Sequence, residues 1–169
     1  MLLLRQDGRL TGVDRESQMI QAARDNAGML GLEQRSAFSC LDLRQRDASW
    51  RESVPPGGFD LVLANPPYRA PSSGRQNPGL MCADARFENQ ATLQDMAEAA
   101  RAACTTKGRF CLIFPAERLP HACCTMQATG FALKRILPLH SRATEPARLV
   151  LLEARCQGGE GALLEPPLV

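Results

Sequence analysis

The sequence lacks any apolar run close to the roughly 20 residues that a membrane-spanning helix requires. Its first residues, MLLLRQDG, are too short for a secretion signal and lack a basic start and a small-residue cleavage site. A hydrophobic fraction of 44% and a charged fraction of 22% are ordinary for a globular domain. We therefore expect a cytoplasmic protein with one domain, residues 1–169, long enough to bury a core.

Residue patterns typical of metal sites are also absent. The chain has only two histidines, His121 and His140, and no two cysteines are spaced Cys-x-x-Cys. The seven cysteines are at positions 40, 82, 104, 111, 123, 124 and 156. We expect buried, reduced thiols and no bound metal.

Lysine is scarce: of the 20 lysine and arginine residues, only Lys107 and Lys134 are lysines. Arginine suits planar, bidentate contacts with phosphate, so nucleic acid stays open as a partner. A GC-rich genome would produce the same bias, and a net charge of +2 alone argues for no partner.

Apolar runs alternate with helical periodicity, which predicts an α/β fold with a doubly wound, mostly parallel sheet. The last two strands are expected to form an antiparallel pair, residues 70–89 a long loop and residues 156–169 a loosely structured tail. The expected strands are 9–13, 36–40, 59–64, 109–114, 132–139 and 147–154, and the expected helices are 16–30, 92–104 and 116–128.

Acidic side chains follow the first two strands, where α/β folds bind ligands. Asp14 could accept both hydroxyls of a ribose, or it could cap the helix that follows. Asp42 could accept a hydrogen bond from an adenine amino group while Leu43 packs on the ring, or it could be a solvated loop residue. Both alternatives stay open for both acids.

The third strand end, FDLVLANPPYRAP at 59–71, places an uncharged amide after an almost wholly apolar strand. The Asn65 side-chain oxygen and the Pro66 carbonyl are two acceptors that can hold the two N–H groups of an exocyclic amine. Tyr68 offers a face for stacking a base, and Pro66 and Pro67 stiffen the loop. The alternative is a plain turn, since Asn-Pro often begins one.

Asn65, Pro66, Pro67 and Tyr68 resemble the catalytic motif of S-adenosylmethionine-dependent methyltransferases that modify amino groups. Within that group the chain is similar, from residue 9 to residue 169, to the bacterial tRNA adenine-N6 methyltransferases that modify a valine tRNA. The matching stretches are NPPYRAPSSGRQNP at 65–78, ARFE at 85–88, KGRFCLIFPAERL at 107–119 and LVLLEA at 149–154.

This resemblance implies a Rossmann-like class I fold, S-adenosyl-L-methionine as cofactor and tRNA as partner. It implies that Asp14 binds the cofactor ribose and Asp42 its adenine, with Leu43 and Asn65 also in the cofactor site. Asn65, Pro66 and Tyr68 would aim the target nitrogen at the methyl group, with no general base required. Five arginines would bind the RNA: Arg69, Arg75, Arg86, Arg142 and Arg148.

One element of the family is missing from the sequence. Family members begin with a strand and a glycine-rich turn, whereas Gly8 and Gly12 form no such turn. We therefore expect an N-terminally incomplete methyltransferase domain without its first strand, and whether it methylates as it stands is open. Two alternative functions also stay open: methylation of a glutamine amide in release factors, and a non-catalytic RNA-binding remnant.

Overall fold

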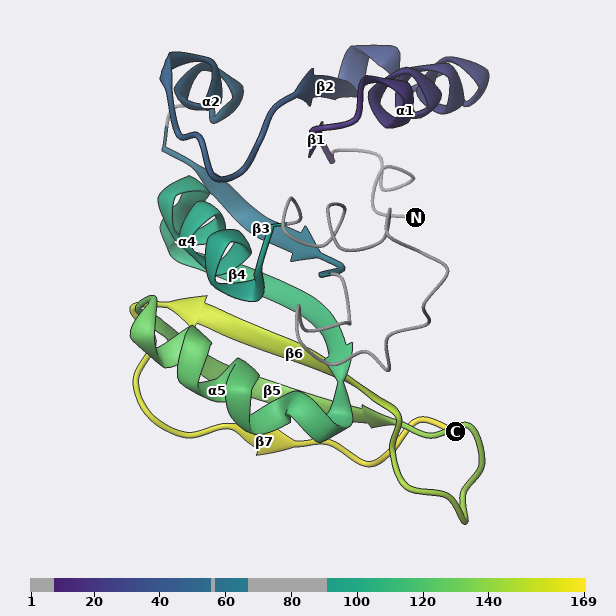
Figure 1. Cartoon of the computed structure of the whole chain (residues 1–169), viewed down its shortest axis with the longest axis vertical. Coiled ribbons are helices and arrows are strands. Elements are labelled where there is room, and N and C mark those ends of the chain that lie inside the picture. Colours follow the sequence, from purple (N-terminus) through teal and green to yellow (C-terminus); the bar gives the residue numbers. More distant parts are fainter. Residues whose placement is uncertain (1–7, 56, 67–90) are drawn as a thin grey trace, which may run out of the picture. The chain divides into compact units, whose positions relative to one another are not determined.

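The computed structural model describes residues 8–55, 57–66 and 91–169 (Figure 1). The chain divides into two compact units, Met1–Pro56 and Gly57–Val169. Within the described ranges, no helix has the length and apolar character needed to cross a bilayer.

The first unit is a β-α-β arrangement. Strands β1 (Leu10–Asp14) and β2 (Ser36–Cys40) pair in parallel, and α1 (Ser17–Met29) and the short 3-10 helix η2 (Glu33–Arg35) connect them. Helix α2 (Ala48–Ser53) follows, and its Asp47 side chain accepts a hydrogen bond from the Trp50 backbone. Among the described residues of this unit, the buried apolar ones are Ile20, Ala27, Leu32 and Trp50.

The second unit contains a five-stranded sheet with the order β3-β4-β6-β5-β7. Strands β3, β4, β5 and β7 run in one direction and β6 runs in the other. The carboxyl ends of β3, β4 and β5 therefore lie at one edge of the sheet, which we call the carboxyl edge. The strand bounds are β3 Phe59–Ala64, β4 Cys104–Pro115, β5 Phe131–Leu139, β6 Leu149–Cys156 and β7 Leu163–Leu164.

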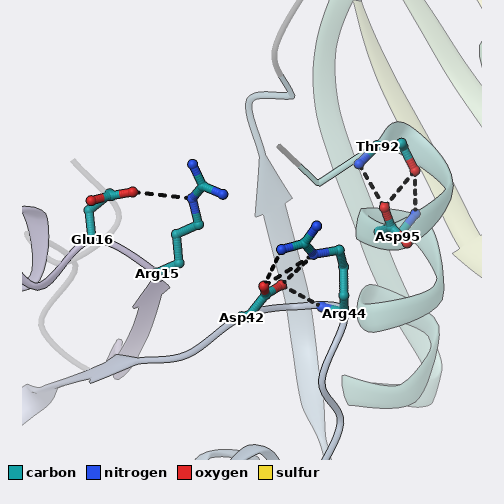
Figure 2. A network of polar contacts seen from close by, with 6 residues as sticks. All are labelled: Arg15, Glu16, Asp42, Arg44, Thr92 and Asp95. Atoms are coloured by element: carbon teal, nitrogen blue, oxygen red, sulfur yellow. Dashed lines mark hydrogen bonds and ion pairs between the residues drawn. The ribbon is translucent and has the colours of Figure 1, made fainter. Parts of the chain in front are cut away.

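Two helices pack on one face of this sheet (Figure 1). Helix α4 (Leu93–Ala103) contacts β3 and β4, while α5 (Leu119–Ala128), preceded by the 3-10 helix η3 (Ala116–Arg118), contacts β5 and α4. At the start of α4, Thr92 and Asp95 bond each other's backbone N–H groups in a capping box (Figure 2). The core between helices and sheet centres on Phe110, Leu112, Phe114, Met126 and Leu152.

The α/β class is confirmed, as is the antiparallel C-terminal strand pair formed by β5 and β6. The expected strands 36–40 and 59–64 match β2 and β3. The sequence did not predict α2, and β4 begins earlier than expected. Among the described residues β1 pairs only with β2, and β3 pairs only with β4. That the domain lacks its first strand stays a prediction.

The prediction of a loosely structured tail is wrong for residues 163–168. Strand β7 runs along β5, Glu165 N donates to Ile136 O at 2.9 Å, and Leu168 N donates to Pro138 O at 2.9 Å. Lys134 Nζ also donates to the carbonyl oxygens of residues 159–161. The glycines and prolines of the tail suggested disorder, but the edge of β5 supplies backbone partners that local sequence does not reveal.

Gly58 allows the chain to enter β3 against the end of α4. Its φ is +87°, and a Cβ added there would lie 2.8 Å from the Ala103 carbonyl oxygen. We expect Gly58→Ala to lower the free energy of unfolding by about 2–4 kcal/mol, from backbone strain and overpacking together.

Gly57→Ala is the matched control, because Gly57 has the same φ of +87° but open space where its Cβ would lie. It should cost about 1 kcal/mol, and urea unfolding of both variants measures the difference. Equal losses would show that the close approach to α4 has no energetic effect.

Candidate active site

The acids of the first unit are brought together by the pairing of β1 with β2. Asp14 and Cys40 are partners in the parallel register, and Leu41 N donates to Asp14 O at 2.9 Å. Asp42 follows two residues after Cys40, so Asp14 and Asp42 lie at the same end of this two-stranded sheet. That end is where α/β folds bind ligands, as the sequence predicted.

Asp14 is exposed and presents a carboxylate acceptor. Its Oδ1 accepts a hydrogen bond from Glu16 N at 2.8 Å, and its Oδ2 contacts no donor among the described residues. The N-cap residue of α1 is Glu16, which makes no side-chain cap. The alternative of Asp14 as the helix cap is therefore wrong, and its carboxylate stands just before the helix with one oxygen available.

Asp42 forms a tight ion pair with Arg44 (Figure 2). Arg44 Nη2 lies 2.5 Å from Oδ2, Nε lies 3.0 Å from Oδ1, and the Arg44 backbone N–H also donates to Oδ1 at 3.0 Å. These hydrogen bonds from Arg44 lower the pKa of Asp42 to about 2. Asp42 therefore remains a carboxylate throughout the physiological range, and Leu43 beside it is half-buried.

Arg44, which the sequence did not single out, is the partner of the candidate site residue Asp42. A carboxylate offers about four lone-pair sites, and Arg44 alone directs four hydrogen bonds to Asp42. An adenine amine would have to share Asp42 with Arg44 or displace it. The sequence does place an acid and an arginine two residues apart after a strand, which is compatible with an ion pair. Whether the two side chains pair depends on their conformations, which the sequence does not show.

Arg44→Met should change the acid response of the first unit. Because the folded-state pKa of Asp42 is about 2, below its ordinary 3.8, the pair stabilises the fold above pH 3.8. That contribution is lost as the pH falls from 3.8 toward 2, so the variant should lose less stability than wild type across this interval.

Unfolding followed by circular dichroism at stepped pH measures this effect. Arg51→Met, at an exposed arginine on α2, is the control and should behave as wild type. Identical acid profiles for Arg44→Met and wild type would contradict the assigned cause of the lowered pKa.

Asn65 and Pro66 follow the last residue of β3 in the second unit. The backbone of β3 is held by parallel pairing with β4, in which Ala64 is the partner of Leu112. Asn65 is exposed and Pro66 is buried, so a buried ring anchors the chain directly after the amide. The remaining motif residues Pro67 and Tyr68, and the expected RNA-binding residues Arg69, Arg75 and Arg86, lie outside the described residues.

Arg142 and Arg148 lie in the turn between β5 and β6, at the carboxyl edge that β3 also reaches. Both are exposed. Arg142 Nη1 lies 3.0 Å from Glu145 Oε1, whereas the Arg148 side chain has no partner among the described residues. The structure thus places Asn65 and these two arginines at one edge of one sheet.

Cysteine and metal chemistry gain no support from the described part of the chain. No group of three or more His, Cys, Asp or Glu residues there could hold a metal ion, and the six described cysteines are free. Burial raises the pKa of the half-buried Cys104 thiol to about 11, which keeps it protonated and a poor nucleophile.

Several solved structures share this fold, and two of them are described as methyltransferases. One, from Agrobacterium tumefaciens, is described as a predicted O-methyltransferase; the likeness has a TM-score of 0.71 and 21% identity, and covers 94% of this chain and 67% of that one. A TehB-like S-adenosylmethionine-dependent methyltransferase from Corynebacterium glutamicum has a TM-score of 0.54 and 15% identity, covering 89% of this chain and 69% of that one. These likenesses confirm the Rossmann-like fold of class I methyltransferases.

The family follows from the sequence match. Residues 3–136 match the UPF0020 family, an RMKL-like methyltransferase domain, and the chain belongs to that family. A relative from a Flavobacteriaceae bacterium (strain 3519-10), named a tRNA1(Val) (adenine(37)-N6)-methyltransferase, is 32% identical over 94 residues. That match covers 55% of this chain and 38% of the relative, so the shared region is about two fifths of the relative's length.

Proposed function

We propose that this chain carries the methyl-transfer site of an S-adenosylmethionine-dependent N6-adenine methyltransferase that acts on tRNA. The observation that carries the proposal is the exposed Asn65 followed by the buried Pro66 at the carboxyl end of β3, in a methyltransferase-family domain. The name of the tRNA-modifying relative supports the choice of substrate.

The acids of the first unit suit the adenosine end of the cofactor. The ribose of S-adenosylmethionine presents two hydroxyl donors, and the exposed Asp14 carboxylate has an oxygen available to accept from them. Asp42, ionised and held by Arg44, supplies negative charge two residues after β2. The cofactor, when bound, supplies a methyl group activated by its sulfonium.

Asn65 and Pro66 would hold the target amine. The adenine N6 amine has two N–H donors and a lone pair that is delocalised into the ring. Acceptance of both hydrogens by the Asn65 side-chain oxygen and the Pro66 carbonyl would fix the orientation of the amine and increase electron density on its nitrogen. The proton becomes acidic once the nitrogen carries the methyl group, so no general base is needed beside the motif.

A glutamine side chain presents the same planar NH2 group, so the substrate needs a direct test. The 169-residue chain is incubated with methyl-labelled S-adenosylmethionine and either an unmodified valine tRNA transcript or a purified release factor. We expect label in the tRNA and none in the release factor. Label in the release factor alone would overturn the RNA assignment.

A second transcript, with guanosine in place of the target adenosine, is the matched control for the RNA arm. It should accept no label at that position. Equal labelling of both transcripts would contradict an adenine-specific site.

A further inference from the structure

The two acids expected to hold the adenosine part of the cofactor differ in what already occupies them. Asp14 and Asp42 both follow strands of the first unit and lie at the same end of its two-stranded sheet. Oδ2 of Asp14 contacts no donor among the described residues, so it can accept from a ribose hydroxyl. Asp42, in contrast, already has an arginine on both of its carboxylate oxygens.

Arg44 uses the acceptor capacity of Asp42 (Figure 2). Its Nη2 lies 2.5 Å from Oδ2, and its Nε lies 3.0 Å from Oδ1 and 3.1 Å from Oδ2. The Arg44 backbone N–H donates to Oδ1 at 3.0 Å. Because a carboxylate has about four lone-pair sites, these contacts leave little capacity for the adenine amine.

The local backbone brings the two residues of this ion pair together. Gln45 N donates to Asp42 O at 2.9 Å, which closes a four-residue turn after β2. The side chains of Arg44 and Asp42 are 34% and 20% exposed, so the pair is partly shielded from solvent. The ion pair is therefore formed within one turn and does not depend on distant parts of the chain.

The amine of a bound adenine would compete poorly with Arg44. The guanidinium brings a positive charge and several donors to the carboxylate, whereas the amine is neutral and offers one N–H to it. Hydrogen bonds from Arg44 lower the pKa of Asp42 most, and the charge of Arg15 lowers it further. Arg15 has its own ion-pair partner, because its Nε lies 3.2 Å from Glu16 Oε1.

We infer that Arg44 keeps Asp42 from accepting a hydrogen bond from the adenine amine, so that the site recognises the adenosine of the cofactor through its ribose, at Asp14. Arg44 is thus the residue that sets how strongly the site selects for the adenine amine. This inference rests on the cofactor role in the proposed function and deepens it. It differs from the expectation drawn from the resemblance, in which Asp42 itself binds the adenine.

Calorimetry with S-adenosylhomocysteine and its 6-deamino analogue tests the inference on the 169-residue chain. The analogue has hydrogen in place of the adenine amine and is otherwise identical. Neither compound carries a sulfonium, so removal of an arginine does not act through a positive charge on sulfur. Wild type should bind the two compounds with affinities within about threefold of each other, because the amine meets no free carboxylate.

Arg44→Met should free Asp42 to accept from the amine. S-adenosylhomocysteine should then bind about tenfold more tightly than it binds wild type, through a new charge-assisted hydrogen bond. The deamino analogue lacks the donor, so the ratio of the two affinities should also rise by about tenfold. Arg44→Lys keeps the charge but loses the two-nitrogen contact, and it should give an intermediate ratio.

Arg51→Met is the matched control, because it removes an exposed arginine on α2 that is not among the described partners of Asp42. It should leave both affinities and their ratio at the wild-type values. If circular dichroism shows that Arg44→Met does not fold, Arg44→Lys and the wild-type ratio provide the test.

The outcomes separate this inference from the proposed function. Equal ratios in wild type and Arg44→Met, whether large or small, would overturn the inference even if the chain methylates tRNA. Weaker binding of S-adenosylhomocysteine by Arg44→Met would also overturn it, because the guanidinium would then contact the purine. No binding of either compound by wild type would overturn both proposals. The expected rise in the ratio, without methyl transfer to tRNA by wild type, would support the inference and contradict the proposed activity.

Discussion

Asn65→Ala is expected to lower kcat for methyl transfer by at least about 10²–10³-fold, while the affinity for S-adenosylmethionine stays near wild type. Loss of the side-chain acceptor leaves one hydrogen of the target amine unbound and its nitrogen free to rotate away from the methyl group. Asn65 is exposed after β3 and outside the core, so the truncation should not affect folding.

Single-turnover transfer and calorimetry with the cofactor measure the two effects separately. Asp60→Ala, at an exposed residue near the start of the same strand, is the control and should retain activity. Parallel loss of turnover and of cofactor affinity in Asn65→Ala would show that Asn65 has a structural role.

Asp14→Ala is expected to weaken the binding of S-adenosylmethionine by about 1–3 kcal/mol, because charge-assisted hydrogen bonds to the ribose are lost. The same substitution removes the bond from Glu16 N to Oδ1, so part of the effect could come from the turn before α1. Asp14→Asn separates the two contributions, since an amide oxygen still accepts from Glu16 N but carries no charge.

Calorimetric titration of wild type and both variants checks this prediction, with Asp25→Ala, an exposed acid on α1, as the control. Asp14→Asn should bind more weakly than wild type and more tightly than Asp14→Ala. Unchanged cofactor affinity in Asp14→Ala would contradict the ribose role.

Strands and helices with strong local patterns could be predicted from the sequence. The continuous apolar run of β3 and the helical spacing of α4 each contain enough local information to define their elements. The positions of Asp14 and Asp42 at one strand edge followed from the parallel β-α-β order alone. The polar residues after these strands were therefore found before any contact was known.

Contacts that depend on distant partners could not be predicted. The tail pairs with β5 through backbone bonds to Ile136 and Pro138, and the residues that make those bonds carry no local signal. Arg118 Cζ lies 5.0 Å from the ring centroid of Phe114, four residues earlier. That spacing suggests contact only once the chain turns into η3. The ion pair between Arg142 and Glu145 depends on the geometry of the turn. From the sequence alone, Arg142 and Arg148 therefore looked equivalent.

The position of the transferred methyl group tests the central claim most directly. A valine tRNA transcript is incubated with the chain and labelled S-adenosylmethionine and digested to nucleosides, and the products are separated by mass spectrometry. Because the acceptors at the end of β3 are suited to a planar NH2 group, the account predicts N6-methyladenosine as the product. Methylation of a ring nitrogen or a ribose oxygen would contradict it.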